Sequence, residues 1–395
     1  MNYPIRFAPL KLPLLLRIFV FSALFPWLVA CQTPAPENMP TSVVTVAPEV
    51  TATPETTGNS ALADLLAYLP SSWVGRHLPV AWGPAIHFVD VAQIRRDLEL
   101  ADFSGADAFA EKQALILQVH NQGLAYLPAS LPIVGSHSFS SLGWDIADVA
   151  QVLYLPDADT AILHGDFARP EIQTALEANG TGTAYRAFTF YPAGSDGLYM
   201  AWKEDTLIAS GLADGEYIVK ALIDNQAHPG LAVQTKIQAL LPHMVGAWGA
   251  VLAPSPDTAA FSAQNMSNLP PEMQDQLEER FGSLVMPALA WDFMAMQHRQ
   301  EGDTTRLVLV YNYPTADAAA ANRNTVLISL TETPSTQVAN QTWADLLTVD
   351  RVMTVENQVI VQAHTEAINF IGKAFNQRDF TGFLALPIDV PTNQP

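Results

Sequence analysis

The sequence predicts an α+β protein made of two tandem, duplicated modules of largely antiparallel sheet, with helices packed mainly on one face. Three observations carry this prediction. Alternating apolar strands come in hairpin-like runs, helical stretches separate the runs, and three segments of the first half recur in order in the second. A chain of 395 residues also exceeds what one hydrophobic core usually organises. We therefore expect modules at residues 59–228 and 229–395.

Three pairs of segments carry the internal repeat. VAWGPAIHFVD (80–90) resembles GAWGAVLAPSP (246–256) at an offset of 166 residues. Residues 159–176 resemble 303–320, each a strand followed by a proline near the start of a small-residue helix. Residues 198–225 resemble 351–377, each a strand, a polar turn, a second strand and a helix. Recurrence in one order predicts a duplication. The alternative is one large α+β domain whose elements merely look alike.

Further helices are predicted outside the repeated pairs. NSALADLLAYL (59–69) has a capping residue followed by apolar residues at helical spacing. LAVQTKIQALLPHM (231–244) is expected to form a helix that links the modules, and LPPEMQDQLEERFG (269–282) an amphipathic helix before the second set of strands. The tail DVPTNQP is expected to fray.

The first 30 residues have the layout of a secretory signal peptide. Residues 1–17 are basic, and residues 18–30 (IFVFSALFPWLVA) are uncharged and apolar. A membrane-spanning helix needs about 20 apolar residues, whereas this run is short, follows Arg17 and contains Pro26. We therefore expect a cleaved signal instead of a permanent anchor.

The end of this segment, LVAC (28–31), resembles the lipobox of bacterial lipoprotein precursors. The resemblance covers residues 1–31 only. It implies cleavage between Ala30 and Cys31 and attachment of lipid, such as palmitate, to Cys31, which is the only cysteine of the chain. Several acyl chains give stable membrane anchoring. The resemblance thus predicts an exported protein held at a bacterial membrane, with its ectodomain outside the cytoplasm.

Residues 31–58 are predicted to be a tether between the lipid and the folded modules. The stretch after Cys31 contains five prolines and seven threonines and shows no helical or alternating pattern. In a polyproline conformation its 27 residues reach at most about 80 Å. Gln32 follows the cysteine, in place of the aspartate that retains some Gram-negative lipoproteins at the inner membrane.

The charge distribution argues against nucleic-acid binding. All 39 acidic residues lie after Cys31, together with only 16 of the 19 basic ones. A surface this acidic repels phosphate backbones, and the sequence has no stripe of lysine or arginine to offset it. The same acidity keeps the ectodomain soluble.

His164 and Asp166, in LHGDF, are the sequence's weak candidates for catalysis. They stand at the end of a predicted strand, before a predicted helix, where a site can open. The matching stretch of the second half, LVYNY, has neither group. A polar pair in a loop is the plainer interpretation. If both side chains belong to an active site, they should converge in one pocket with other polar groups.

Other motifs give no recognisable chemistry. Ser138, His137 and Asp145 are close in sequence but lack the G-x-S-x-G elbow, and PDADT (156–160) departs from the calcium-loop pattern and is expected to be a turn. The sequence shows no metal-ligand spacing and no phosphate-binding loop, so we expect no metal and no cofactor. The repeat-related Trp82 and Trp248 are expected to pack in the core, although aromatic platforms also bind sugars.

These observations favour a membrane-anchored, exported lipoprotein with a non-catalytic binding or scaffolding ectodomain. Its ligand could be an envelope protein, a glycan or a small molecule, bound in a cleft between the modules. Two alternatives stay open. One is an envelope enzyme that uses scattered residues such as His164 and Asp166, and the other is a purely structural surface protein.

Overall fold

The structure is a computed structural model. It describes residues 60–71, 86–100, 108–121, 144, 146–192, 198–255, 291–333 and 342–366. All of these residues belong to one compact unit. The signal peptide, Cys31, the tether, the helix predicted at 269–282 and the C-terminal tail lie outside the described residues, so those expectations stay predictions.

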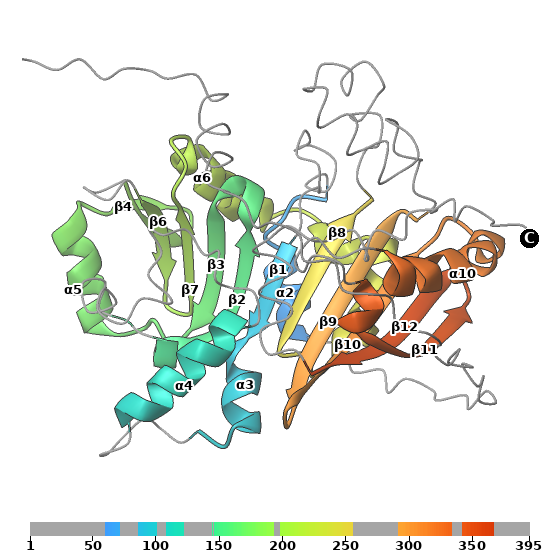
Figure 1. The fold of residues 1–395 in the computed structure, drawn as a ribbon. Helices are drawn as coiled ribbons and strands as arrows, with labels where there is room; N and C mark the ends of the chain where they lie inside the picture. The colour runs from blue at the N-terminus through green and yellow to red at the C-terminus, as the bar shows by residue number, and fades with distance from the viewer. Residues whose placement is uncertain are drawn as a thin grey trace, which may run out of the picture. The chain divides into compact units, whose positions relative to one another are not determined.

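The described strands form one antiparallel sheet of twelve strands, which confirms the predicted α+β class (Figure 1). Their order in the sheet is β11-β12-β10-β9-β8-β1-β2-β3-β7-β6-β5-β4. The strands are β1 (Ile86–Asp90), β2 (Val149–Leu155), β3 (Thr160–Gly165), β4 (Thr183–Tyr185), β5 (Phe188–Tyr191), β6 (Tyr199–Lys203), β7 (Thr206–Ser210), β8 (Gly249–Pro254), β9 (Phe293–Glu301), β10 (Thr304–Asn312), β11 (Thr348–Val355) and β12 (Gln358–Thr365).

The two halves of the sheet have the same strand order, as the sequence repeat predicts. The first half runs β1-β2-β3-β7-β6 and the second β8-β9-β10-β12-β11, so each of these ten strands has a counterpart at the same place. A helix follows the third strand of each half, α5 (Pro170–Asn179) and α10 (Ala316–Glu332). The hairpin of β4 and β5 extends the first half beyond β6, whereas β11 is the last described strand at the other end.

The halves join where β1 pairs with β8 (Figure 1). This antiparallel ladder sets Ile86 opposite Leu252 and Val89 opposite Gly249. The strands of both halves are therefore hydrogen-bonded into one sheet, and the two modules share a backbone interface. The boundary predicted between residues 228 and 229 falls in the connection between α6 (Gly215–Asn225) and β8, and it stays a prediction.

Helices cover both faces of this sheet, where the sequence predicted helices mainly on one. On one face a core shared by both halves packs under α2 (Ser60–Leu66), α6 and α7 (Thr235–Gln238). On the other face the core is divided. One part packs under α3 (Val91–Asp97), α4 (Ala108–Asn121) and α5, and the other under α10 and the 3-10 turn η9 (Trp343–Asp345).

The cause lies in the central strands, which are apolar on both sides. All five residues of β1 and of β7 are buried. Successive side chains of a strand point to opposite faces, so such a strand needs a cover on each side. In β7 the side chain of Ile208 enters the shared core, while Leu207 and Ala209 enter the core of the opposite face.

The linking helix predicted at residues 231–244 is wrong as a single element. The structure has three short pieces instead: η6 (Leu231–Val233), α7 and η7 (Leu241–Met244). Gln234 is extended, with φ −66° and ψ 129°, and Pro242 stands at the start of η7. Proline removes a backbone donor, so the helical pattern cannot continue through it. The apolar spacing nevertheless predicted burial correctly, since the apolar residues of this segment are buried: Leu231, Ile237, Leu241 and Met244.

Candidate functional site: a tyrosine-lined groove on α6

A groove of about 690 Å³ lies along the outer side of α6. This volume falls within the range of ligand sites in proteins. We call it the α6 groove. Its lining combines aromatic, acidic and basic side chains with small residues: Tyr185, Tyr199, Ala213, Asp214, Glu216, Tyr217, Lys220, Ala221, Asp224, Asn225 and His228.

The sequence of α6 explains how the helix presents these residues. Val219, Leu222 and Ile223 are buried in the shared core, at helical spacing. Tyr217 lies on the opposite side, and 76% of its surface is exposed. Near the helix start, a side chain at Gly215 would come within 2.7 Å of the ring of Tyr199, so glycine lets that ring approach the helix closely.

Asp224 connects α6 to the β4–β5 hairpin. The hydroxyl of Tyr185 donates to Oδ2 of Asp224 at 2.8 Å, and Nε of Arg186 donates to Oδ1 at 2.9 Å. Both hydrogen bonds hold the pKa of Asp224 below its ordinary value, that from Tyr185 most of all. Arg186 sits in the hairpin turn with a φ of 57°, a left-handed conformation that is uncommon for such a residue. This wall of the groove is therefore fixed by a charged carboxylate with two donors.

Lys220 has three close neighbours in the groove. Its Nζ lies 4.7 Å from the ring centroid of Phe190 and 5.2 Å from that of Tyr185. It also forms an ion pair with Glu216 at 2.5 Å, one turn earlier in α6. The ammonium group is thereby neutralised locally and has aromatic faces beside it.

The catalytic candidates His164 and Asp166 both line one hollow. This second hollow, of about 290 Å³, is lined by both residues together with Arg95, Asp148, Gln151 and Asp205. His164 ends β3, and its ring meets the ring of Tyr68 edge-on, with centroids 6.1 Å apart. The backbone N–H of Asp166 donates to the carbonyl of Asp148 at 2.7 Å.

The chemistry of this His164 pocket is restricted. Partial burial lowers the pKa of His164, while the carboxylate of Asp205 opposes that shift. A neutral imidazole can act as a base. However, Asp148 is already paired with Arg169, and the described residues contain no group of three His, Cys, Asp or Glu side chains able to hold a metal ion.

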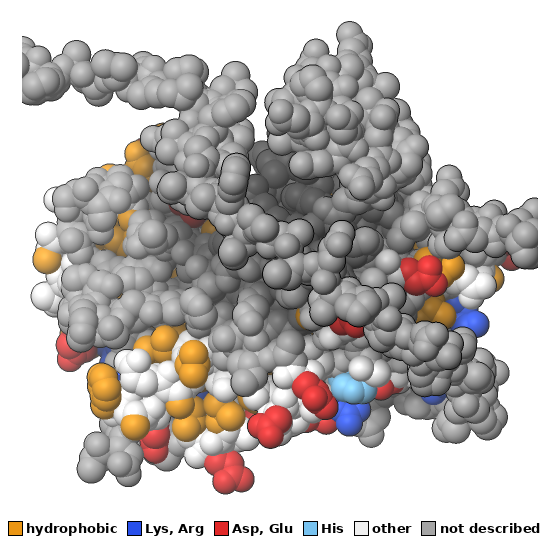
Figure 2. All heavy atoms as spheres, in the orientation of Figure 1, with side chains coloured by type: hydrophobic (Ala, Val, Ile, Leu, Met, Phe, Trp, Pro, Cys, Tyr) orange, Lys and Arg blue, Asp and Glu red, His pale blue; other side chains and the backbone are white. Residues whose placement is uncertain are grey.

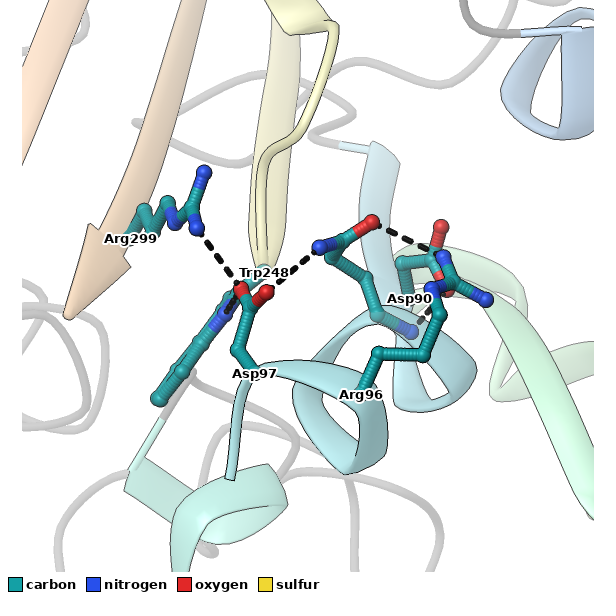
Figure 3. A network of polar contacts seen from close by, with 6 residues as sticks. Asp90, Arg96, Asp97, Trp248 and Arg299 are labelled. Carbon is teal, nitrogen blue, oxygen red and sulfur yellow. Dashed lines mark hydrogen bonds and ion pairs between the residues drawn. The ribbon is translucent and has the colours of Figure 1, made fainter. Parts of the chain in front are cut away.

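A polar network ties the two halves together beside the β1–β8 ladder (Figure 3). Asp97, at the end of α3, accepts from Nε1 of Trp248 at 2.6 Å and forms an ion pair with Arg299 at 3.1 Å. Gln93 donates to the other oxygen of Asp97 at 2.8 Å, and its own backbone N–H donates to Asp90 at 2.8 Å. We call this the seam network. The network has a structural role, since the carboxylates of Asp90 and Asp97 both accept hydrogen bonds from groups of the protein.

Two fully buried histidines lie next to this seam. His87 is on β1, and His298 is on β9 opposite Gly249 of β8. A side chain at Gly249 would come within 2.4 Å of the His298 ring, so the glycine makes room for it. Burial lowers the pKa of His87 to about 4, and burial together with His87 lowers that of His298 to about 3. Both rings are therefore neutral at pH 7.

The remaining predicted residues separate into two groups. Trp248 is 2% exposed and packs in the core as expected, and PDADT forms the turn η5 (Pro156–Ala158) between β2 and β3. Outside the described residues lie Ala30, Cys31, Trp82, His137, Ser138 and Asp145.

The sequence does not predict the α6 groove, and the tryptophans that it offers as aromatic platforms lie elsewhere in the structure. Of these, Trp144, Trp248, Trp291 and Trp343 are buried. The usable signal was a tyrosine at position 217, on the polar face of an otherwise regular amphipathic helix. Its partners on β4 and β6 come from other elements, and no local pattern joins them to it.

Comparisons with known proteins leave the family of this chain open. No family model matches it, and no curated protein matches it either. Among solved structures, crystal form I of TP0453 matches with a TM-score of 0.39 and 9% identity, over 79% of this chain and 97% of that one. Crystal form III gives a TM-score of 0.38 and form IV one of 0.35. Likenesses this distant carry no argument about function.

The acidic composition is visible on the described surface. Figure 2 shows red acidic side chains on the face drawn, with fewer blue basic ones among them. Among the described helices, none has the length and apolar character needed to cross a bilayer.

Proposed function

We propose that this chain is an exported, lipid-anchored protein of the bacterial envelope whose ectodomain binds a ligand without catalysis. The proposed localisation rests on the signal-like segment 1–30, the lipobox resemblance at residues 28–31 and the predicted tether up to residue 58. The α6 groove is the single observation that carries the binding role. It offers three tyrosines and hydrogen-bonding groups in a volume suited to a ligand.

The construction of the groove supports this role. Asp224 and Lys220 are fixed in place by neighbouring side chains, so a ligand would meet a wall that is already ordered. Preorganisation of this kind lowers the entropy cost of binding. The groove also depends on the β4–β5 hairpin, which lies beyond the repeated part of the sheet. One copy of the duplicated fold thus carries a feature of its own.

The proposed membrane localisation is tested by replacing the single cysteine. Cys31→Ser removes the thiol that lipidation requires, so the protein should leave the membrane fraction and appear in the soluble fraction. Thr41→Ser, a comparably small change in the tether, is the matched control and should stay with the membrane. Unchanged membrane retention of Cys31→Ser would refute the lipid assignment.

The binding role is tested by thermal unfolding of the full chain with panels of peptides, glycans and metabolites. A ligand that binds the folded state raises the unfolding temperature, and the increase grows with the logarithm of the ratio of ligand concentration to Kd. The increase should be lost in Tyr217→Ala, because this variant removes a ring that lines the groove. Tyr217 is exposed, so its removal does not disturb the core. Absence of any shift with every panel would count against a ligand-binding module and in favour of a structural surface protein.

An envelope enzyme is the second candidate, and the shared pocket of His164 and Asp166 favours it. It predicts turnover of a chromogenic ester, amide or glycoside that disappears in His164→Ala while the fold persists. Turnover that survives both His164→Ala and Asp166→Asn would eliminate this pocket as an active site.

A further inference from the structure

We infer that the ligand of the α6 groove is a neutral glycan, with the rings of Tyr217 and Tyr199 stacking on its sugars. This inference rests on the proposed function of the groove as the ligand site. It adds the chemical class of the ligand, which the charges, the exposed aromatic rings and the place of the groove in the fold determine together.

The charges of the groove disfavour an anionic ligand. Three carboxylates line it, those of Asp214, Glu216 and Asp224. The cation in the lining, Lys220, is committed to Glu216, and the nearby Arg186 is committed to Asp224. An incoming phosphate or carboxylate would meet repulsion from Asp214 and would have to break one of these two ion pairs to find a partner.

The groove is equally unsuited to a cationic ligand. The ring faces of Tyr185 and Phe190 that could attract a cation already have the ammonium group of Lys220 beside them, at 5.2 and 4.7 Å. A second cation placed there would be repelled by Lys220. Glu216 and Asp224 are each neutralised by their own partner, and Asp214 is the N-cap residue of α6, where the positive end of the helix offsets its charge. The electrostatic balance therefore favours a ligand without net charge.

The remaining aromatic surface suits sugar rings. Tyr217 is 76% exposed and Tyr199 half-buried, and among the described residues neither hydroxyl has a hydrogen-bond partner. A sugar ring has an apolar C–H face, which packs on an aromatic ring, and hydroxyls around its rim, which need donors and acceptors. Tyrosine supplies both kinds of contact in one side chain. Asn225 and Asp214 add an amide and a carboxylate at the rim of the groove.

The groove also has the right form for a chain of sugars. It is an open hollow along a helix, lined from Ala213 before α6 to His228 after it. A helix of 11 residues is about 16 Å long, which corresponds to roughly three to four sugar units laid end to end. A small metabolite would not need such an extended lining. We therefore expect an oligosaccharide to bind better than a single sugar.

The test measures binding of neutral tetrasaccharides to the full lipidated chain. The protein is held in lauryldimethylamine oxide, a detergent without a sugar headgroup. The probes are the β-1,4-linked tetramer of N-acetylglucosamine, cellotetraose, maltotetraose and mannotetraose, followed by saturation-transfer NMR and titration calorimetry. We expect at least one to bind, with signal transfer concentrated on the ring C–H protons.

Three variants locate the binding. Tyr217→Ala should weaken the affinity by about tenfold or more, since it removes one stacking platform. Tyr217→Phe keeps the ring and should stay within about threefold of the wild type. Phe109→Ala on α4 removes another aromatic ring, 71% exposed, from a different surface and should change nothing.

A peptide arm separates failure of the glycan class from failure of the site. If none of the four sugars binds but a library of uncharged 12-residue peptides does, with loss in Tyr217→Ala, then the glycan inference is overturned while the groove remains a binding site. Sugar binding that is unchanged in Tyr217→Ala overturns both the inference and the proposed site. Binding of neither class overturns both as well.

Discussion

Acidification should weaken the seam between the two halves, because His87 is buried there as a neutral ring. The perturbation is a change from pH 7.5 to pH 5.0, applied to the wild type and to His87→Leu. Leucine is apolar and cannot take up a proton. Any part of the pH dependence that belongs to His87 therefore disappears in the variant.

The sign and size follow from the two pKa values. In the folded chain the pKa of His87 is lowered to about 4 by burial, against 6.5 for an ordinary histidine. Between these values the unfolded chain binds the proton and the folded chain does not, so stability falls as the pH falls. The contribution of His87 is intact above pH 6.5, and about 2 kcal/mol of it is lost by pH 5.0. His298 acts in the same direction, and a charge on one ring opposes a charge on the other.

The assay is urea unfolding followed by tryptophan fluorescence at both pH values. The free energy of unfolding of the wild type should drop between pH 7.5 and 5.0 by about 2 kcal/mol more than that of His87→Leu. Comparing the two proteins cancels the contributions of the acidic residues, which titrate in both. Equal losses in wild type and variant would refute the reasoning, because they would show that the ring at position 87 does not stay neutral in the folded seam.

Two further substitutions examine the same region by urea unfolding. Gly249→Ala places a methyl group within 2.4 Å of the buried ring of His298 and should destabilise the fold by about 1–3 kcal/mol, whereas Gly180→Ala has 4.0 Å of room and should be close to neutral. Trp248→Phe removes the N–H that donates to Asp97 and should cost about 1–2 kcal/mol. In an Asp97→Ala background the same change should cost less, and equal costs in both backgrounds would exclude the coupling.

Much of the fold was predictable because its signals are local. Prolines at positions 170 and 314 mark helix starts after a strand, and the polar turns of the β6–β7 and β11–β12 hairpins stand between alternating runs. The order of these signals in each half reflects the order of strands in the sheet. A repeat in sequence therefore predicted a repeat in topology, without any knowledge of which strands pair across the halves.

The pairing of the halves was not predictable in this way. β1 and β8 meet although Leu252 lies 166 positions after Ile86 in the chain, and no local pattern encodes that contact. The sequence does not predict the helices on the second face of the sheet either. A strand such as β7 is buried on both sides, so its sequence shows no alternation of apolar and polar residues. Residues 231–244 were misjudged because burial of their apolar residues looks the same in one helix as in three short turns.

The two candidate sites differ in the same way: one depends on neighbouring residues in the sequence, and the other on contacts between distant elements. His164 and Asp166 are two residues apart, so the fact that both line one hollow could be anticipated from their place at a strand end. The α6 groove takes Tyr185 from β4, Tyr199 from β6 and Tyr217 from α6. Its existence depends on how the hairpin packs beside the helix, which is a property of the tertiary structure alone.

The ladder between β1 and β8 has a consequence for the symmetry of the sheet. Ile86 lies opposite Leu252, and the repeat aligns these same two residues at an offset of 166. An antiparallel pairing that sets one residue opposite its own counterpart, as Ile86 and Leu252 are set at the start of β1, is the pairing found at a two-fold axis. Two identical single modules would join through the same edge. The contact between β1 and β8 therefore has the register that two copies of one module would show across a two-fold axis.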